Sequence, residues 1–401
     1  MQRPAFSSVF RTVHGESDSG PAAGASSVLV AHPSPDLYGS DRVLIESVRG
    51  LVAGGMSVTV TLPAQGPLTA EIEEAGATVV ICPTPVIRKS ILTPRGFASF
   101  SLHLARGIIA GSRLMRTAKP DVIYVNTLTI PLWSVLARAF GKPVLTHVHE
   151  AERSAPRIFR FLLSAPLLLS RSVIANSDFS AAVVADSVRG LAARTVVVYN
   201  GVAGPPDPEA ARTDLAPAVR LLYVGRLSSR KGVDVAVSAL GSIVKRGVSA
   251  SLDVVGAVFP GYEWYELELR DMVDNLGLSE HVTFHGFTPD VWPHLARTDI
   301  VLVPSRLDEP FGNTAVEALL AGRPVIVSDT SGLREAAGNY RSAQLVSPGD
   351  AGALAEAVER VVDNWPAYRD HAQTDAAAAL ARHSPQGYGA RISAELKAVL
   401  T

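Results

Sequence analysis

The sequence has one cysteine and no long apolar run, and each shortage excludes a class of protein. Cys82 cannot form an internal disulfide, so a disulfide framework is excluded, and the low cysteine usage fits a reducing compartment. No segment reaches the ~18 uninterrupted apolar residues that a membrane-spanning helix needs. Residues 1–26 are rich in Ser, Gly, Ala and Pro without a long apolar stretch. We therefore expect a mobile tail there and not a secretory signal.

The usual nucleotide-binding fingerprints are also missing. The first expected strand is followed by Ala31-His-Pro-Ser-Pro and not by G-x-G-x-x-G, and the sequence contains no Walker A motif. There is no Asp-x-Asp pair to hold a metal ion on a diphosphate. His147 and His149 form a close pair, but a spacing of two predicts structural residues more than zinc ligands. We therefore expect no nicotinamide cofactor, no P-loop ATPase and no metal.

Length and patterning predict an α/β protein with two domains. The 401 residues exceed the ~250–300 at which a single hydrophobic core stops growing. Short β-branched segments alternate with helical patterns along the whole chain, which predicts two doubly wound, Rossmann-like parallel sheets. The first series of expected strands is 27–31, 57–62, 77–80, 121–125, 143–146, 173–175 and 196–198. The second series is 221–224, 252–255, 282–284, 300–303, 325–327 and 344–346.

A stretch rich in Gly, Pro and Ala follows the first series, at residues 201–217, and predicts a break between domains. We expect an N-terminal domain over 27–203, a linker over 204–218 and a C-terminal domain over 219–383.

Two carboxylates flank a turn in the motif Glu309-Pro-Phe-Gly-Asn-Thr-Ala-Val-Glu317. Asn313 and Thr314 are candidate helix caps, and the free backbone N–H groups of a helix start suit a phosphate. Glu309 and Glu317 would then hold hydroxyls on either side of a diphosphate. The spacing alone favours two solvated carboxylates, so the pair needs support from elsewhere in the chain.

That support comes from the motif Val224-Gly-Arg-Leu-Ser-Ser-Arg-Lys-Gly232, in which a buried strand ends at Gly225. Arg226 and Lys231 would flank the top of a parallel sheet, where open α/β folds bind ligands. A guanidinium fork and an ammonium together suit a diphosphate, although either residue alone is an ordinary basic residue on an exposed loop.

These motifs, with Glu317-Ala-Leu-Leu-Ala-Gly-Arg-Pro-Val-Ile326 and Gly332-Leu-Arg-Glu335, resemble the C-terminal half of the retaining glycosyltransferases of family four. The N-terminal half resembles the family more weakly, through segments such as Asp36-Leu-Tyr-Gly-Ser-Asp-Arg42. The resemblance covers about residues 27–362, with the motifs in the family's order. It implies the GT-B fold, with a last helix over 384–401 that crosses back to the N-terminal domain.

The resemblance also implies residue roles. Glu317 would bind the ribose, Glu309 a hydroxyl of the donor sugar, and Arg226 and Lys231 the diphosphate, while His149 would face the donor sugar. The implied catalytic residues are Glu309, His149, Arg226 and Lys231. The implied donor-binding residues are Glu317, Gly312, Asn313, Thr314, Gly39 and Gly225. The loop at Gly39 departs from the family pattern because Ser40 and Asp41 follow it.

Together these features predict a metal-independent retaining glycosyltransferase, of the hexosyltransferase type, that uses a nucleoside-diphosphate sugar. Its acceptor would be a hydroxyl, for instance of a lipid-linked or cell-envelope glycan precursor. Two alternatives stay open: another GT-B enzyme such as an epimerase or a phosphorylase, and a catalytically silent sugar-nucleotide-binding protein.

Charge is distributed unevenly along the chain. Residues 1–200 carry 19 Lys and Arg against 13 Asp and Glu, and residues 86–172 carry 13 against 3. A basic region of this kind suits peripheral contact with an anionic membrane, and the alternative is a solvated basic face. We expect a cytoplasmic protein that docks on the inner face of the plasma membrane. A nucleic-acid partner is not expected, because the net charge is −1 and no recognition motif is present.

Overall fold

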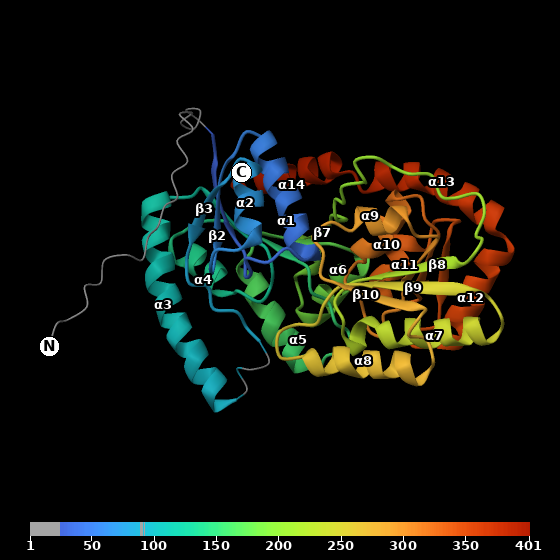
Figure 1. Cartoon of the computed structure of the whole chain (residues 1–401). Coiled ribbons are helices and arrows are strands. Elements are labelled where there is room, and N and C mark those ends of the chain that lie inside the picture. Colours follow the sequence, from blue (N-terminus) through green and yellow to red (C-terminus); the bar gives the residue numbers. More distant parts are fainter. Residues whose placement is uncertain (1–24, 89–90, 92) are drawn as a thin grey trace. The chain divides into compact units, whose positions relative to one another are not determined.

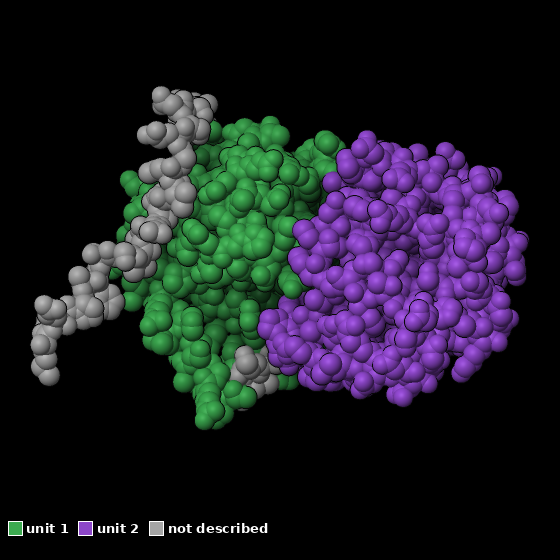
Figure 2. Space-filling model, viewed as in Figure 1, with its two compact units in different colours: residues 1–201, 385–401 green, residues 202–384 purple. Residues whose placement is uncertain are grey.

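The computed structural model describes residues 25–88, 91 and 93–401, so most of the expected tail at 1–26 and one basic residue, Lys89, lie outside the described residues. The chain divides into two compact units, which Figure 2 shows in green and purple. Unit 1 comprises the described residues up to Gly201 together with Pro385–Thr401, and unit 2 comprises Val202–Ser384.

Unit 1 is built on a seven-stranded sheet in the order β3-β2-β1-β4-β5-β6-β7, with every strand pair parallel. Figure 1 labels β2, β3 and β7 of this sheet. Its strands are β1 (Ser27–Ala31), β2 (Ser57–Leu62), β3 (Thr78–Ile81), β4 (Val122–Val125), β5 (Val144–Val148), β6 (Ser172–Ala175) and β7 (Thr195–Val197). Its α-helices are α1 (Gly39–Ala53), α2 (Pro67–Glu74), α3 (Pro94–Ala118), α4 (Leu132–Ala139), α5 (Arg157–Ser164), α6 (Asp178–Ser187) and α14 (Pro385–Leu400). Two 3₁₀ turns, η2 (Ala165–Leu169) and η3 (Ala192–Arg194), complete it.

Unit 2 has a six-stranded parallel sheet in the order β10-β9-β8-β11-β12-β13. Its strands are β8 (Val219–Val224), β9 (Ala250–Val255), β10 (Val282–Gly286), β11 (Ile300–Val303), β12 (Val325–Ser328) and β13 (Ala343–Val346). Its helices are η4 (Ser229–Lys231), α7 (Val233–Lys245), α8 (Glu263–Asn275), α9 (Trp292–Ala296), α10 (Asn313–Leu320), α11 (Ser331–Ala337), α12 (Ala351–Asp363) and α13 (Trp365–Arg382).

The central strands are apolar because they are buried on both faces. In β1, Val28 and Val30 belong to one hydrophobic cluster, whereas Leu29 and Ala31 belong to another on the opposite face of the sheet. A parallel sheet covered by helices on both sides requires this near-continuous apolar run. The predicted fold class, with two parallel α/β sheets and each expected strand in place, is thereby confirmed.

The last helix, α14, belongs to the first unit although it is the end of the chain. It packs on α1 at a glycine contact, where a Cβ added to Gly50 would lie 2.3 Å from the Cα of Gly389. Further along the same contact, the Tyr388 hydroxyl lies 2.6 Å from Ser47 Oγ. The buried side chains of α14 join the hydrophobic cluster that lines one face of the sheet.

The segment expected as a linker, 204–218, belongs to unit 2 and packs against the rest of it. The Arg212 guanidinium donates to both carboxylate oxygens of Asp299, at 2.7 and 2.6 Å, and to backbone carbonyls within the segment. The Trp365 ring nitrogen donates to the carbonyl of Arg212, and Arg323 donates to the carbonyl of Glu209. These bonds fix the segment to unit 2 at several points along its length.

Candidate functional site

Two glycines bring the ends of β8 and β9 close together at the carboxyl edge of the sheet in unit 2. Gly225 and Gly256 follow these strands with φ of 154° and 142°. A Cβ on Gly256 would lie 1.8 Å from the carbonyl oxygen of Gly225, so a side chain cannot be accommodated there. Because glycine has no side chain, a ligand can approach the backbone closely at this edge, which is where open α/β sheets bind ligands.

The predicted basic pair lies just beyond this edge, and both residues have partners. The Arg226 guanidinium carbon lies 3.4 Å from the centroid of the Phe259 ring, in a cation–π arrangement. Lys231 ends the short helix η4 and is followed by Gly232, which has a φ of 72°. A Cβ on Gly232 would lie 2.0 Å from the carbonyl oxygen of Pro304, which fixes the turn that presents Lys231.

Glu309 is a buried carboxylate, only 6% exposed, with two side-chain partners. Lys231 Nζ lies 2.8 Å from its Oε1, and the Ser305 hydroxyl donates to the same oxygen at 2.8 Å. Burial by itself would raise the pKa of Glu309, but the positive charges of Lys231 and Arg230 outweigh it, and the pKa lies below its usual value. Glu309 is therefore an anion at neutral pH, held by an ammonium group that is itself partly exposed.

Backbone contacts with the start of α11 hold the Glu309 loop. The Ser331 hydroxyl accepts from the backbone N–H of Glu309 at 2.9 Å and donates to its carbonyl at 3.0 Å. The N–H of Gly332 donates to the same carbonyl at 3.0 Å. A Cβ on Gly332 would lie 2.6 Å from this oxygen, so the contact explains the glycine of the Gly332-Leu-Arg-Glu335 motif.

The start of α10 differs from the sequence prediction. Gly312, with a φ of 129°, is the N-cap residue, and no side chain caps the helix, so the assignment of Asn313 and Thr314 as caps is wrong. They are instead the first two helical residues, and the Thr314 hydroxyl donates to the carbonyl of Val224 at 3.5 Å. Glu317 lies in the second turn of α10 and is half-buried.

The remaining predicted residues, His149 and Gly39, belong to unit 1. His149 follows β5, and its Nε2 lies 2.9 Å from the Asn126 side-chain oxygen. The Asn126 side-chain nitrogen lies 3.0 Å from His32 Nδ1, and His32 Nε2 lies 2.8 Å from the Asp41 carboxylate. Gly39 is the first residue of α1, two positions before Asp41. Burial lowers the pKa of His149 to about 3, so the ring is neutral.

Sequence reasoning missed His32, Asn126, Ser305 and Ser331 as members of these arrangements. A signal was available for two of them, because His32 directly follows β1 and Asn126 directly follows the neighbouring strand β4. Polar residues that follow adjacent parallel strands lie at one edge of the sheet. Ser305 and Ser331 carried no such signal.

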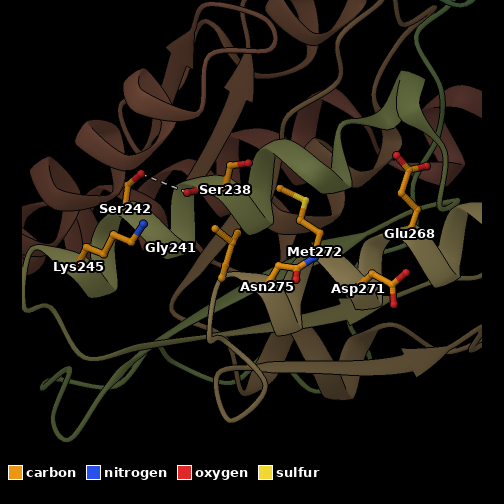
Figure 3. A pocket seen from close by; sticks show the side chains of 9 residues that line it. Ser238, Gly241, Ser242, Lys245, Glu268, Asp271, Met272 and Asn275 are labelled. Atoms are coloured by element: carbon orange, nitrogen blue, oxygen red, sulfur yellow. Dashed lines mark hydrogen bonds between the residues drawn. The ribbon is translucent and has the colours of Figure 1, made fainter.

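A separate groove of about 490 Å³ lies between α7 and α8 (Figure 3). Residues of these two helices and Leu276, the C-cap of α8, line it, and none of them was predicted for the site. They are Ser238, Gly241, Ser242, Lys245, Glu268, Asp271, Met272, Asn275 and Leu276.

The described residues contain no group of three or more His, Cys, Asp or Glu side chains placed to hold a metal ion. The metal-free mechanism remains a prediction.

Helices α3 and α5 of unit 1 expose apolar side chains beside arginines. Phe97 and Ile109 on α3 are 61% and 55% exposed, and Ile158 and Leu162 on α5 are 59% and 57% exposed. The exposed arginines of these helices include Arg106, Arg113, Arg116 and Arg157. Among the helices described, none combines the length and apolar character needed to cross a bilayer.

Comparison with known proteins identifies the class. HepE of Anabaena, solved with UDP and glucose, superposes with a TM-score of 0.77 at 22% identity, covering 92% of this chain and 99% of that one. The fold is therefore that of the GT-B glycosyltransferases. Residues 216–378 match the family Glycosyl transferases group 1, and residues 38–203 match Glycosyltransferase Family 4. The two matches span both units, and the chain belongs to this family of glycosyltransferases.

Relatives with assigned names are also sugar transferases. The chain is 27% identical over 336 residues to 2-deoxystreptamine glucosyltransferase of Streptomyces kanamyceticus, covering 77% of this chain and 84% of that protein. It is 34% identical over 171 residues to the GDP-mannose-dependent alpha-(1-6)-phosphatidylinositol monomannoside mannosyltransferase of Mycobacterium tuberculosis, covering 39% and 43%.

Proposed function

We propose that this glycosyltransferase moves a hexose from a nucleoside-diphosphate donor to an acceptor hydroxyl with retention at the anomeric carbon. The observation that carries the proposal is the pair of Lys231 and Glu309 at the glycine-lined sheet edge. Without a ligand, the ammonium group neutralises the carboxylate. A diphosphate offers Lys231 more negative charge, so donor binding would draw the ammonium away and leave Glu309 to accept a hydrogen bond from the donor sugar.

The other residues take roles around this exchange. Arg226 joins Lys231 on the diphosphate, helped by the backbone at Gly225, Gly312, Asn313 and Thr314. Glu317 accepts the ribose hydroxyls. From unit 1, His149 contacts the donor sugar and Gly39 approaches the diphosphate. Stabilising the departing diphosphate is then the main catalytic task, and its oxygen takes the proton of the acceptor hydroxyl on the same face of the sugar.

Names of relatives favour transfer over the alternatives of an epimerase, a phosphorylase or a silent binding protein, since those quoted above are a glucosyltransferase and a mannosyltransferase. One of them acts on a phosphatidylinositol mannoside, which supports a lipid-linked acceptor here. We place the protein in the cytoplasm, on the inner face of the plasma membrane, with α3 and α5 of the basic region 86–172 as the docking surface. The partners are the donor and a sugar or lipid-linked acceptor, not nucleic acid.

Removing either cation should weaken donor binding and slow transfer. Arg226→Ala and Lys231→Ala should each lower turnover by ~10²-fold or more, because each cation stabilises the developing charge by ~2.7 kcal/mol or more. Steady-state kinetics with a panel of UDP-, GDP-, ADP- and dTDP-sugars measure this. Lys245→Ala, a basic residue of the α7–α8 groove, is the matched control and should behave as wild type. Unchanged kinetics in both variants would exclude the diphosphate assignment.

The two glutamates should affect different kinetic constants. Glu317→Gln should mainly raise the Michaelis constant for the donor, because the ribose contact already exists in the ground state. Glu309→Gln should mainly lower turnover, because its partner sugar gains charge during departure. Calorimetric binding of the free nucleoside diphosphate completes the test. The reverse pattern, with affinity lost only in Glu309→Gln, would mean that the donor lies in the opposite orientation.

Chelation should leave most of the activity intact, because Arg226, Lys231 and the start of α10 supply the positive charge that a metal provides in other transferases. The measurement is the transfer rate after treatment with a chelator and removal of the chelated ions. Activity abolished by the chelator and restored by Mn²⁺ would contradict the metal-free mechanism.

The protein should bind vesicles of phosphatidylglycerol and not of phosphatidylcholine, and salt should release it, because basic residues near an anionic surface each contribute ~1 kcal/mol. Arg113→Glu combined with Arg157→Glu should weaken binding at least about tenfold in a sedimentation assay. Arg189→Glu, an exposed residue of unit 1 outside 86–172, is the control. Equal sedimentation with both lipids would leave the basic region as a solvated face.

A further inference from the structure

Four buried or half-buried polar side chains form a continuous hydrogen-bonded row at the carboxyl edge of the sheet in unit 1. Asp41 Oδ1 lies 2.8 Å from His32 Nε2, and His32 Nδ1 lies 3.0 Å from the Asn126 side-chain nitrogen. The Asn126 side-chain oxygen lies 2.9 Å from His149 Nε2. We call these four residues the Asp41 relay.

The fold explains why these residues meet. His32, Asn126 and His149 directly follow β1, β4 and β5, which are consecutive neighbours in the sheet. Asp41 reaches the row from the first turn of α1. His32, Asn126 and Asp41 are 1%, 1% and 3% exposed, so water cannot replace a missing partner within the row.

The atoms that face each other set the direction of every hydrogen bond in the relay, because a carboxylate only accepts and an amide nitrogen only donates. The N–H of Tyr38 can only donate, and it donates to Asp41 Oδ2 at 2.7 Å. The other oxygen, Oδ1, accepts from His32 Nε2–H, which leaves His32 Nδ1 to accept from the Asn126 amide. The amide oxygen of Asn126 then faces His149 and accepts from its Nε2–H.

The last member of the relay is therefore a neutral histidine with a defined tautomer. Its Nε2 carries the proton, and its Nδ1 keeps a lone pair. Within the described part of the chain, no side chain or backbone group forms a hydrogen bond with this Nδ1. The ring of His147 packs against His149, with 4.0 Å between the ring centroids, which further restricts its orientation.

We propose that Asp41 is a positioning residue that acts through His32 and Asn126 to fix His149 as a hydrogen-bond acceptor for a hydroxyl of the donor sugar. This inference rests on the proposed function, in which His149 contacts that sugar. The relay holds the acceptor nitrogen ready before the donor arrives, so no tautomer change is needed on binding.

The relay makes a specific prediction for Asp41→Asn. The N–H of Tyr38 still requires an acceptor, so the new amide must turn its oxygen to Tyr38 and its nitrogen to His32. His32 Nε2 must then accept, its Nδ1 must donate, and Asn126 must turn its oxygen toward His32. The nitrogen of Asn126 now faces His149, whose proton moves to Nδ1. One substitution thus reverses every bond in the row and removes the acceptor.

Two-bond ¹H–¹⁵N spectra of the full chain, labelled with ¹⁵N-histidine, report the tautomer of each ring directly, and His149→Gln assigns the signal. Wild type should show a proton on Nε2 of His149, and Asp41→Asn should show it on Nδ1. Turnover of Asp41→Asn should fall about tenfold or more, with the donor Michaelis constant changed less than about twofold, because a contact of the reacting sugar is lost.

The double variant with Asp41→Asn and Asn126→Asp provides the rescue. A carboxylate at position 126 accepts from both neighbouring histidines, so it should return the His149 proton to Nε2 and recover turnover. Asp36→Asn, an exposed carboxylate in the same loop, controls for the lost charge and should change neither readout.

The spectra do not depend on activity, so failure of the relay and failure of the proposed function are distinguishable. A wild-type His149 protonated on Nδ1, or a tautomer unchanged in Asp41→Asn, overturns the relay even if transfer is observed. A reversed tautomer with unchanged turnover overturns the role of His149 on the sugar. If Asp41→Asn does not fold, a wild-type His149 that is protonated on Nδ1 still overturns the relay.

Discussion

Parallel pairing places the carboxyl end of every strand at one edge of its sheet, and the candidate sites in both units depend on this constraint. In unit 2 it brings Gly225, at the end of β8, toward the loop that carries Glu309 after β11. In unit 1 it aligns His32, Asn126 and His149 after three neighbouring strands. Residues distant in sequence come together because parallel pairing puts the ends of neighbouring strands side by side. The polar side chains among them then form short contacts.

Both edges bury a carboxylate beside a nitrogen-bearing side chain, but one of the two pairs can be separated by a ligand and the other cannot. Lys231 is about one-third exposed on its side of the pair with Glu309, so a ligand can reach it and compete for its charge. His32 is 1% exposed and stays with Asp41. A carboxylate buried without compensation costs several kcal/mol. Lys231 can therefore leave Glu309 only if a hydroxyl of the donor sugar replaces it as the partner.

The sheets could be predicted because β-branched apolar runs such as 300–303 have no other stable place than a strand covered on both faces. The motifs also located Arg226, Lys231 and Glu309 at the sheet edge. The direct contact of Lys231 with Glu309 was not predictable, since it depends on how two long side chains are directed once the strands have paired.

The capping prediction for Asn313 and Thr314 failed for a backbone reason. Gly312 reaches a φ of 129° that a side chain would disfavour, and the helix starts one residue earlier than a polar cap implies. Hydrogen-bond direction in the Asp41 relay likewise depends on which side-chain atoms face each other, which the sequence does not reveal.

The position of α14 has a consequence for how the chain is made. Unit 2 is one uninterrupted segment, whereas unit 1 consists of the described residues up to Gly201 and the last 17, Pro385–Thr401. Tyr388, Ile392, Leu396 and Val399 fill one face of the unit 1 sheet. During synthesis from the N-terminus, the part of that face that α14 covers therefore stays exposed while the whole of unit 2 is translated. Unit 1 is thus finished only after unit 2 has been made, and the surface that α14 covers is open to chaperones or to aggregation until α14 has left the ribosome.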